Sequence, residues 1–186
     1  MKISRFLSVV ALALVSLSTV SCNKEAEPIV LTGTWNIDSS MTFVSFVYDQ
    51  IEAEANPVTR MYLADINNQR KIVKALHRSQ FVPNKIEFSV LGLTGTASAP
   101  VIFRMKNGSS VDGTYTKYED MLFLITTPLF PNGLVCASDN KLLELYYPRD
   151  FVVQVISSIL TATDPTPEDI ERMIADGSGG AVVYRK

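Results

Sequence analysis

The stretch VIFRMKNGSSVDGTYTKYEDMLFLITT, residues 101–127, decides the fold class. In its first part, Val101, Phe103 and Met105 alternate with Arg104 and Lys106. A period of two indicates a β-strand, because successive side chains of a strand point to opposite faces. Asn107-Gly108 follows, and this pair favours a tight hairpin in which both central positions have positive φ. The stretch therefore predicts antiparallel strands joined by short turns.

The same pattern extends to both sides of this stretch. Pro131-Asn132-Gly133 is expected to introduce one further strand, and Asp139-Asn140 to turn into the next. The expected strands of the meander are 86–90, 101–106, 111–118, 121–125, 134–137 and 142–147. Six consecutive strands with short connections are typical of up-and-down antiparallel topology.

Helical spacing interrupts the strand pattern twice. A first strand at 29–37 is followed by a helical insertion over about 41–78, which Asn56-Pro57 divides into a pair of helices. Further helices are expected at about 149–175, before a last strand at 181–185. The predicted fold is therefore mainly β with added helices. It is an antiparallel up-and-down eight-stranded barrel, with a helix pair after the first strand and helices before the last.

The first 21 residues have the layout of a secretory signal peptide. Lys2 and Arg5 form a positive head, and residues 6–20 are almost wholly apolar or small, short of the about 20 apolar residues of a membrane span. The segment TVSC, residues 19–22, resembles a lipobox, although threonine stands where leucine is usual. This resemblance implies cleavage before Cys22 and lipidation of its thiol. The alternative is ordinary signal cleavage nearby, with Cys22 incidental.

Export divides the chain into a signal peptide at 1–21, a lipidated tether at 22–28 and a domain at 29–186. The polar tether resembles the charged run that directs some Gram-negative lipoproteins to the cell surface. The expected location is the cell envelope, as an outer-membrane lipoprotein facing the periplasm or the surface. The 17 basic residues lose Lys2 and Arg5 on cleavage, which leaves 15 against 19 acidic residues and a net charge of −4. Such a chain, without a basic stripe, is a poor candidate for binding nucleic acid.

The sequence offers few residues for catalysis. Once Cys22 is lipidated, Cys136 is the one thiol left, and it is best explained as a buried small hydrophobe. His77 is the only histidine, and no catalytic triad or metal-ligand spacing surrounds it. The acidic residues within 164–171 fit a charged helix start better than a calcium loop. We therefore expect no enzymatic activity, no metal and no cofactor.

Gly33-Thr34-Trp35 lies on the first predicted strand, and Arg185 ends the last one. The tripeptide matches the Gly-x-Trp motif with which lipocalin-like (calycin-type) barrels begin, and in lipocalins an arginine near the end packs over the tryptophan. The chain resembles this family over 29–186. The resemblance implies that Gly33, Trp35 and Arg185 close one barrel end through a cation–π contact. Lipocalins lack the predicted helix pair, whereas fatty-acid-binding proteins carry a shorter helix-turn-helix at that place.

Two functions fit an exported barrel of this kind. The first is binding of a small apolar or amphipathic ligand, because eight strands leave an interior that is either filled by side chains or holds one small ligand. The candidate lining residues are Phe88, Phe103, Met105, Tyr115, Phe123 and Tyr48. The alternative is a structural or protein-interaction, inhibitor-like role with a packed barrel. The expected partners are the membrane, through the lipid anchor, and either a small hydrophobic ligand or a protein, without nucleic acid.

The helix pair adds a hypothesis about access to the lumen. Its apolar side chains at Val44, Val47, Tyr48 and Ile51 are expected to face inward over a barrel mouth, because isolated helices need an apolar partner. The pair would then be a lid over a ligand or, equally, a plug in a packed barrel.

Overall fold

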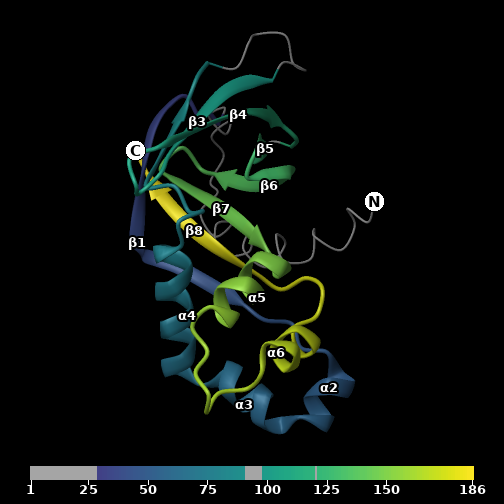
Figure 1. Cartoon of the computed structure of the whole chain (residues 1–186). Helices are drawn as coiled ribbons and strands as arrows, with labels where there is room; N and C mark the ends of the chain where they lie inside the picture. The colour runs from purple at the N-terminus through teal and green to yellow at the C-terminus, as the bar shows by residue number, and fades with distance from the viewer. Residues whose placement is uncertain (1–28, 91–97, 120) are drawn as a thin grey trace. The chain divides into compact units, whose positions relative to one another are not determined.

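The computed structural model describes residues 29–90, 98–119 and 121–186. The predicted signal peptide and the tether with Cys22 lie outside the described residues. Helices follow the first strand and precede the last, with six strands between them (Figure 1). The elements are β1 (Gly33–Ser45), α2 (Gln50–Ala55), α3 (Pro57–Ala64), α4 (Ile66–Arg78), β2 (Lys85–Phe88), β3 (Ala99–Arg104), β4 (Ser110–Lys117), β5 (Leu122–Thr127), β6 (Phe130–Ser138), β7 (Leu142–Pro148), α5 (Arg149–Ser157), α6 (Pro167–Met173) and β8 (Gly179–Arg185).

The eight strands form a closed antiparallel barrel in chain order, from β1 to β8. This confirms the predicted fold class, including the helices after the first strand and before the last. Trp35 on β1 is paired with Ile86 on β2, and Ile86 is paired with Phe103 on β3. Paired residues of neighbouring strands share a face. All three side chains are fully buried, which identifies this face as the barrel core.

The hairpin between β3 and β4 is longer than the sequence predicted. The backbone N–H of Met105 donates to the carbonyl of Ser109 at 2.8 Å, so that residues 106–108 form the loop. Within this loop only Gly108 has a positive φ, of 85°. A three-residue loop with a left-handed glycine therefore replaces the expected two-residue turn.

The turn between β5 and β6 is also displaced from its predicted position. The chain reverses between the paired residues Thr127 and Phe130, and the residues from Pro131 to Gly133 lie within β6. The register of the pairing shifts between Ile125 and Thr127. Proline and a glycine with φ of 84° are tolerated inside this strand because the shift interrupts the hydrogen-bond ladder.

The boundary between β1 and the helices also differs from the prediction. β1 continues to Ser45, so residues 41–45 belong to a strand, and the first helix begins at Gln50. Asp49 caps this helix, because its Oδ1 accepts the backbone N–H of Glu52 at 3.0 Å.

The predicted helix pair consists of three helices. Asn56 ends α2 and caps α3, as expected from Asn56-Pro57. A second break follows at Asp65, whose Oδ1 accepts the backbone N–H groups of Asn67 and Asn68 at 2.9 and 3.0 Å. Such local caps compete with helix continuation, and they divide the segment twice.

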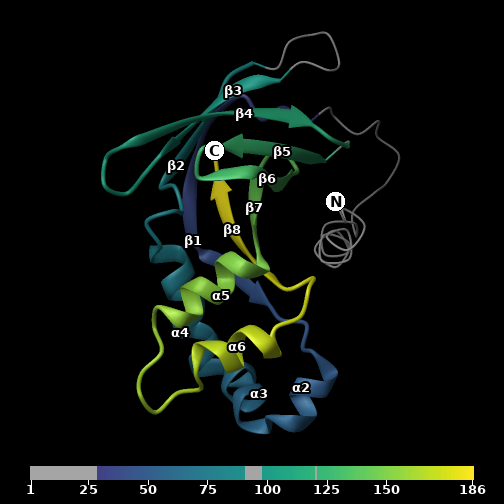
Figure 2. The same ribbon diagram turned by 45° about the vertical axis from the view of Figure 1, so that its right-hand side comes forward.

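The described chain forms two compact units. The barrel unit comprises residues 29–43, 76–147 and 181–186, and the helical unit comprises residues 44–75 and 148–180. Figure 2 shows α2, α3, α5 and α6 gathered together, although the barrel meander separates the first two helices from the last two in sequence. Within the helical unit, distant segments also meet, since the backbone N–H of Ala175 donates to the carbonyl of Val47 at 2.8 Å.

The helical unit has an apolar core of its own. The core residues come from all of its helices and are Ala53, Leu63, Ile72, Val152, Val153, Ile156, Ile170, Met173 and Ile174. The helices that follow β1 therefore bury their apolar faces against α5 and α6. Burial of this kind supplies most of the stability of short helices.

The expectation that Val44, Val47, Tyr48 and Ile51 form one inward apolar helix face is wrong. Val44 lies in β1, and the side chains of Val47 and Ile51 are 46% and 79% exposed. Tyr48 packs against the core of the helical unit. The helical spacing misled because the strand runs to Ser45 and the helix begins only afterwards.

Candidate functional site

Five of the six predicted lining residues lie together in the barrel unit. Phe88, Phe103, Met105, Tyr115 and Phe123 are all buried, with exposed fractions of 7% or less. The sixth predicted residue, Tyr48, lies in the helical unit, where it forms an isolated β-bridge with Ile174. The strand alternation therefore located the barrel-facing residues, whereas helical spacing misplaced Tyr48.

The inward aromatic side chains contact one another directly. The rings of Phe88 and Tyr115 meet edge to face with centroids 4.9 Å apart, and those of Tyr115 and Phe123 lie 6.4 Å apart. The hydroxyl of Tyr115 donates to the carbonyl of Ser89 at 2.6 Å. Burial raises the pKa of Tyr115, so this hydroxyl stays protonated and available as a donor.

Cys136 faces the same core. It is paired with Phe123 on β5 and with Leu145 on β7, and its exposed fraction is 0%. Burial raises the pKa of the Cys136 thiol strongly, because a thiolate would be desolvated in this position. A protonated, inaccessible thiol is a weak nucleophile, so Cys136 contributes packing rather than reactivity.

Two tyrosines that the sequence analysis did not select also belong to the core. Tyr147 on β7 and Tyr184 on β8 have exposed fractions of 1% and 0%. The hydroxyl of Tyr184 donates to the carbonyl of Pro83 at 3.0 Å. Burial and the neighbouring Tyr147 hydroxyl both raise the pKa of Tyr184. All residues of β8 from Gly179 to Tyr184 are buried, so no alternation in this strand distinguishes Tyr184 as an inward residue.

Part of the barrel interior is close-packed. Ile86, Val101, Phe103, Ile125 and Leu145 each have an exposed fraction of 0%. A side chain without exposed area adjoins no space that could admit a water molecule. These five residues therefore contact only protein atoms, as in an ordinary close-packed core.

Trp35 anchors one part of this core. Its side chain is 0% exposed, and its indole N–H donates to the carbonyl of Leu31 at 2.7 Å. Gly33, two residues earlier, has a φ of 113°, a conformation that side-chain-bearing residues rarely adopt. The cation over the indole ring is Lys186, whose Nζ lies 4.9 Å from the ring centroid.

The resemblance to lipocalins thus named the wrong cation. The side chain of Arg185 forms an ion pair with Asp38 at 2.5 Å and contacts the sulfur of Met41 at 3.1 Å. The reason is the period of two in β8: Tyr184 faces the core, Arg185 faces outward, and Lys186 returns to the side of Trp35.

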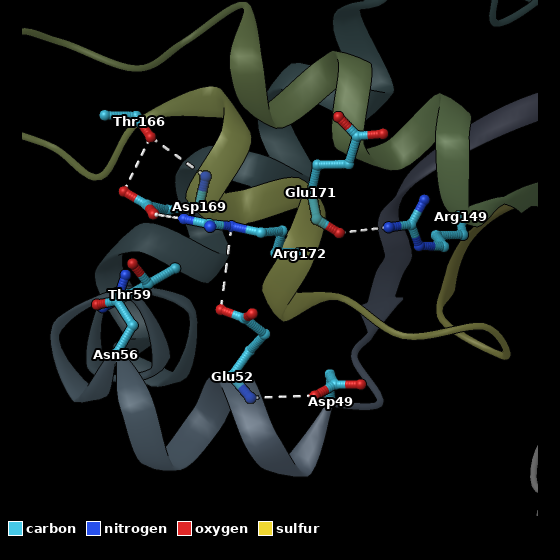
Figure 3. Close-up of polar contacts among 9 residues, drawn as sticks. All are labelled: Asp49, Glu52, Asn56, Thr59, Arg149, Thr166, Asp169, Glu171 and Arg172. Atoms are coloured by element: carbon cyan, nitrogen blue, oxygen red, sulfur yellow. Dashed lines mark hydrogen bonds and ion pairs between the residues drawn. The ribbon is translucent and has the colours of Figure 1, made fainter.

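Polar contacts join the helices of the helical unit (Figure 3). Arg172 on α6 lies between Asp169 of the same helix, at 2.7 Å, and Glu52 on α2, at 4.0 Å. The hydroxyl of Thr166 and the guanidinium of Arg172 lower the pKa of Asp169. The acidic residues around α6 therefore serve as a helix cap and as ion-pair partners.

Arg149 has a different role at the other end of α6 (Figure 3). Its Nε donates to the carbonyl of Ile174 at 2.6 Å, and its Nη2 donates to the carbonyl of Glu171. These carbonyls end the helix and lack partners within it. A guanidinium at this position satisfies them and interacts favourably with the helix dipole.

The surface of the helical unit is unusually apolar along one stretch. Ten large apolar side chains are strongly exposed among the described residues, and five of them lie between residues 47 and 66. These five are Val47, Ile51, Val58, Met61 and Ile66. Single exposed apolar residues are ordinary on protein surfaces, but their concentration in one segment is typical of an interaction surface.

α4 exposes a row of basic side chains. Arg70, Lys71, Lys74 and Arg78 share one helix face by their spacing, opposite the buried Ile72. α4 contains no acidic residue, and among the described residues none of these four side chains forms an ion pair within 4.0 Å. The sequence alone shows this helix face to be rich in lysine and arginine, but the acidic net charge of the whole chain gave no reason to assign it a binding role.

The residues that the structure describes contain no group of three or more His, Cys, Asp or Glu side chains placed to hold a metal ion. None of their helices combines the length and the apolar character needed to cross a membrane.

No protein-family model, no curated protein and no solved structure matches this chain.

Proposed function

We propose that this chain is an exported, lipid-anchored envelope protein whose barrel is a packed scaffold and whose outer surface makes the functional contacts. One observation favours a packed barrel over a barrel that binds a ligand in its lumen. Ile86, Val101, Phe103 and Leu145 have no exposed area, whereas a ligand site needs a cavity of a few hundred Å³. The proposal includes no enzymatic activity and no cofactor.

The lipocalin-like assignment is part of the proposal. It is supported by the closed eight-stranded antiparallel barrel and by its first strand, where Gly33 has a positive φ and Trp35 is buried. Lys186 over Trp35 supplies the cation–π contact that lipocalins make with arginine. Lysine in place of arginine keeps the positive charge over the ring but changes the shape of the charged group, since lysine carries a compact ammonium and arginine a planar guanidinium.

The anchor is proposed from the segment TVSC at residues 19–22. Cys22→Ser should release the mature protein from the membrane fraction or leave the precursor uncut, because the acylated thiol is lost. Fractionation and mass spectrometry of the mature N-terminus test this. An unmodified N-terminus at another residue in the wild-type protein would contradict the anchor.

The packed barrel is tested by ligand extraction and probe binding. The purified protein should release no bound lipid into organic solvent, and a fluorescent fatty-acid probe should show no saturable binding. A stoichiometric extracted lipid, together with saturable probe binding that Phe103→Trp weakens, would support the ligand-binding function instead. Met41→Trp, on an exposed side chain of β1, is the matched control for a larger residue elsewhere.

A further inference from the structure

We propose that the exposed faces of α3 and α4 bind an anionic membrane surface. This inference goes beyond the proposed function and rests on it in one respect, because a lipid anchor would keep the domain close to a membrane. The ligand chemistry is that of phospholipid headgroups over acyl chains, and the observations lie entirely within the helical unit.

The electrostatic part comes from α4. Arg70, Lys71 and Lys74 project from the face opposite Ile72, whose side chain is fully buried in the core of the helical unit. Their orientation away from the core is therefore fixed by packing. Basic residues held near an anionic membrane each contribute to attraction within about one Debye length.

The apolar part comes from α3. Thr59 and Leu63 are buried on one face of this helix, and Val58 and Met61 lie on the opposite face with exposed fractions of 69% and 72%. Ile66, the first residue of α4, is 57% exposed. Side chains of this size can insert at the boundary between headgroups and acyl chains, as in helices that lie on membranes.

The two helices are held together by their connection. The side-chain amide of Asn68 donates to the carbonyl of Tyr62 at 3.1 Å, and that of Gln69 donates to the carbonyl of Leu63 at 3.0 Å. These bonds satisfy carbonyls at the end of α3 and fix the start of α4 against it. The basic side chains of α4 and the apolar side chains of α3 thus lie on two helices that these hydrogen bonds join into one corner.

The composition of this corner favours a membrane over other anionic partners. Its exposed apolar residues are aliphatic, whereas single-stranded nucleic acid is bound by aromatic rings on which bases stack. The acidic groups beside the basic row include Asp164, whose pKa is lowered by hydrogen bonds from Thr161 and by the charge of Lys71, and Asp65, which caps the start of α4. Neither Asp65 nor Asp164 forms an ion pair within 4.0 Å with Arg70 or Lys74 among the residues that the structure describes.

The experiment uses the mature chain, residues 22–186, with Cys22→Ser, so that no acyl chain contributes. It should float with vesicles of phosphatidylcholine containing phosphatidylglycerol and not with phosphatidylcholine alone, and high salt should reverse the binding. The double variant Arg70→Gln/Lys74→Gln should weaken partitioning roughly 25-fold, because each cation contributes about fivefold. Val58→Ser should weaken it further, roughly fivefold.

Matched variants separate this face from general charge and hydrophobicity. Lys117→Gln/Lys141→Gln changes the net charge equally on strands and turns of the barrel unit, and Val90→Ser removes an equally exposed valine there. Both should leave partitioning unchanged. Thermal unfolding of each variant checks its folding, and Lys71→Gln alone replaces the double variant if that one is unstable.

The outcomes are decisive for this proposal. Absence of binding to anionic vesicles, or an equal loss in the barrel-unit variants, would overturn it. Competition by an oligonucleotide or an acidic peptide that binds more tightly than the vesicles would also overturn it, because the face would then have another occupant. Failure here leaves the lipid anchor unaffected, since the anchor is tested by fractionation of the lipidated protein.

Discussion

Lys186 lies over the ring of Trp35, with 4.9 Å between its Nζ and the ring centroid, and the same ammonium donates to the carbonyl of Val30 at 3.0 Å. One side chain thus joins the end of β8 to the segment that leads into β1. The indole N–H of Trp35 donates to the carbonyl of Leu31. Trp35 is the only tryptophan, so its fluorescence reports on this contact.

Lys186→Gln should lower the free energy of unfolding by about 0.5–1 kcal/mol, because a partly exposed cation–π contact is lost. It should also shift the tryptophan emission of the folded protein. Denaturant unfolding followed by fluorescence measures both effects. Arg185→Gln is the control, since it removes an exposed ion pair with Asp38 and should leave the emission unchanged. The reverse pattern would refute the geometry.

Phe103→Ala should lower the free energy of unfolding by about 3–5 kcal/mol, because it removes a large side chain from a close-packed position. Phe43→Ala removes the same side chain from a site on β1 that is 37% exposed, and it should cost much less. Urea titrations of both variants provide the comparison. Equal, small losses would mean that Phe103 borders unfilled space.

His77 should make the stability depend on pH in the range where histidine titrates. Burial, Lys106 and Arg78 lower its pKa, so the folded state binds this proton more weakly than the unfolded state. The free energy of unfolding should therefore be highest above the unfolded pKa of about 6.5 and fall as the pH decreases through it. Among the described atoms, Nε2 of His77 is buried without a hydrogen-bond partner, which disfavours the charged form.

His77→Asn should flatten the pH dependence of the free energy of unfolding between about pH 7.5 and 5, the range in which the histidine of the unfolded chain titrates. His77 is the only histidine, so its imidazole resonance can be followed directly by NMR. A midpoint above that of free histidine would contradict the burial argument. Losses of stability at still lower pH belong to carboxylates such as Asp169, whose pKa is lowered.

Arg149→Gln should destabilise the helical unit by about 1.5–3 kcal/mol, because two carbonyls at the end of α6 lose charged donors. Arg172→Gln makes the same chemical change on the same helical region and should cost less than about 1 kcal/mol, since its ion pairs are exposed. Circular dichroism melts of the two variants test the difference. Equal effects would show that the carbonyl contacts of Arg149 contribute little.

The strands were predictable and the helices less so, for a physical reason. Alternation identified Phe88 and Phe103 as barrel-facing because a strand in a closed barrel has one dry face. The same rule, applied to β8, would have selected Lys186 rather than Arg185. The strand at residues 41–45 was missed because Val44, Val47 and Ile51 also fit a helical period, and short segments allow both interpretations.

The candidate surface was harder to find from the sequence than the barrel. Val58 and Met61 look like core residues of an amphipathic helix, and only the structure shows that Leu63 faces the core instead. The partners of this core, such as Ile156 and Ile170, follow about a hundred residues later. Contacts at that separation leave no periodic signal in either segment.

The helical unit is assembled from two segments, residues 44–75 and 148–180, with residues 76–147 of the barrel unit between them. During synthesis, α2 and α3 therefore emerge long before the helices that cover Leu63 and Ile72. Non-local contacts of this kind close slowly, because the entropy of the intervening chain must be lost first. Residues 178–185 contribute to both units, since Ser178 binds the backbone of Val47 and β8 closes the barrel. We therefore expect that neither unit completes its fold before residues 174–185 are available.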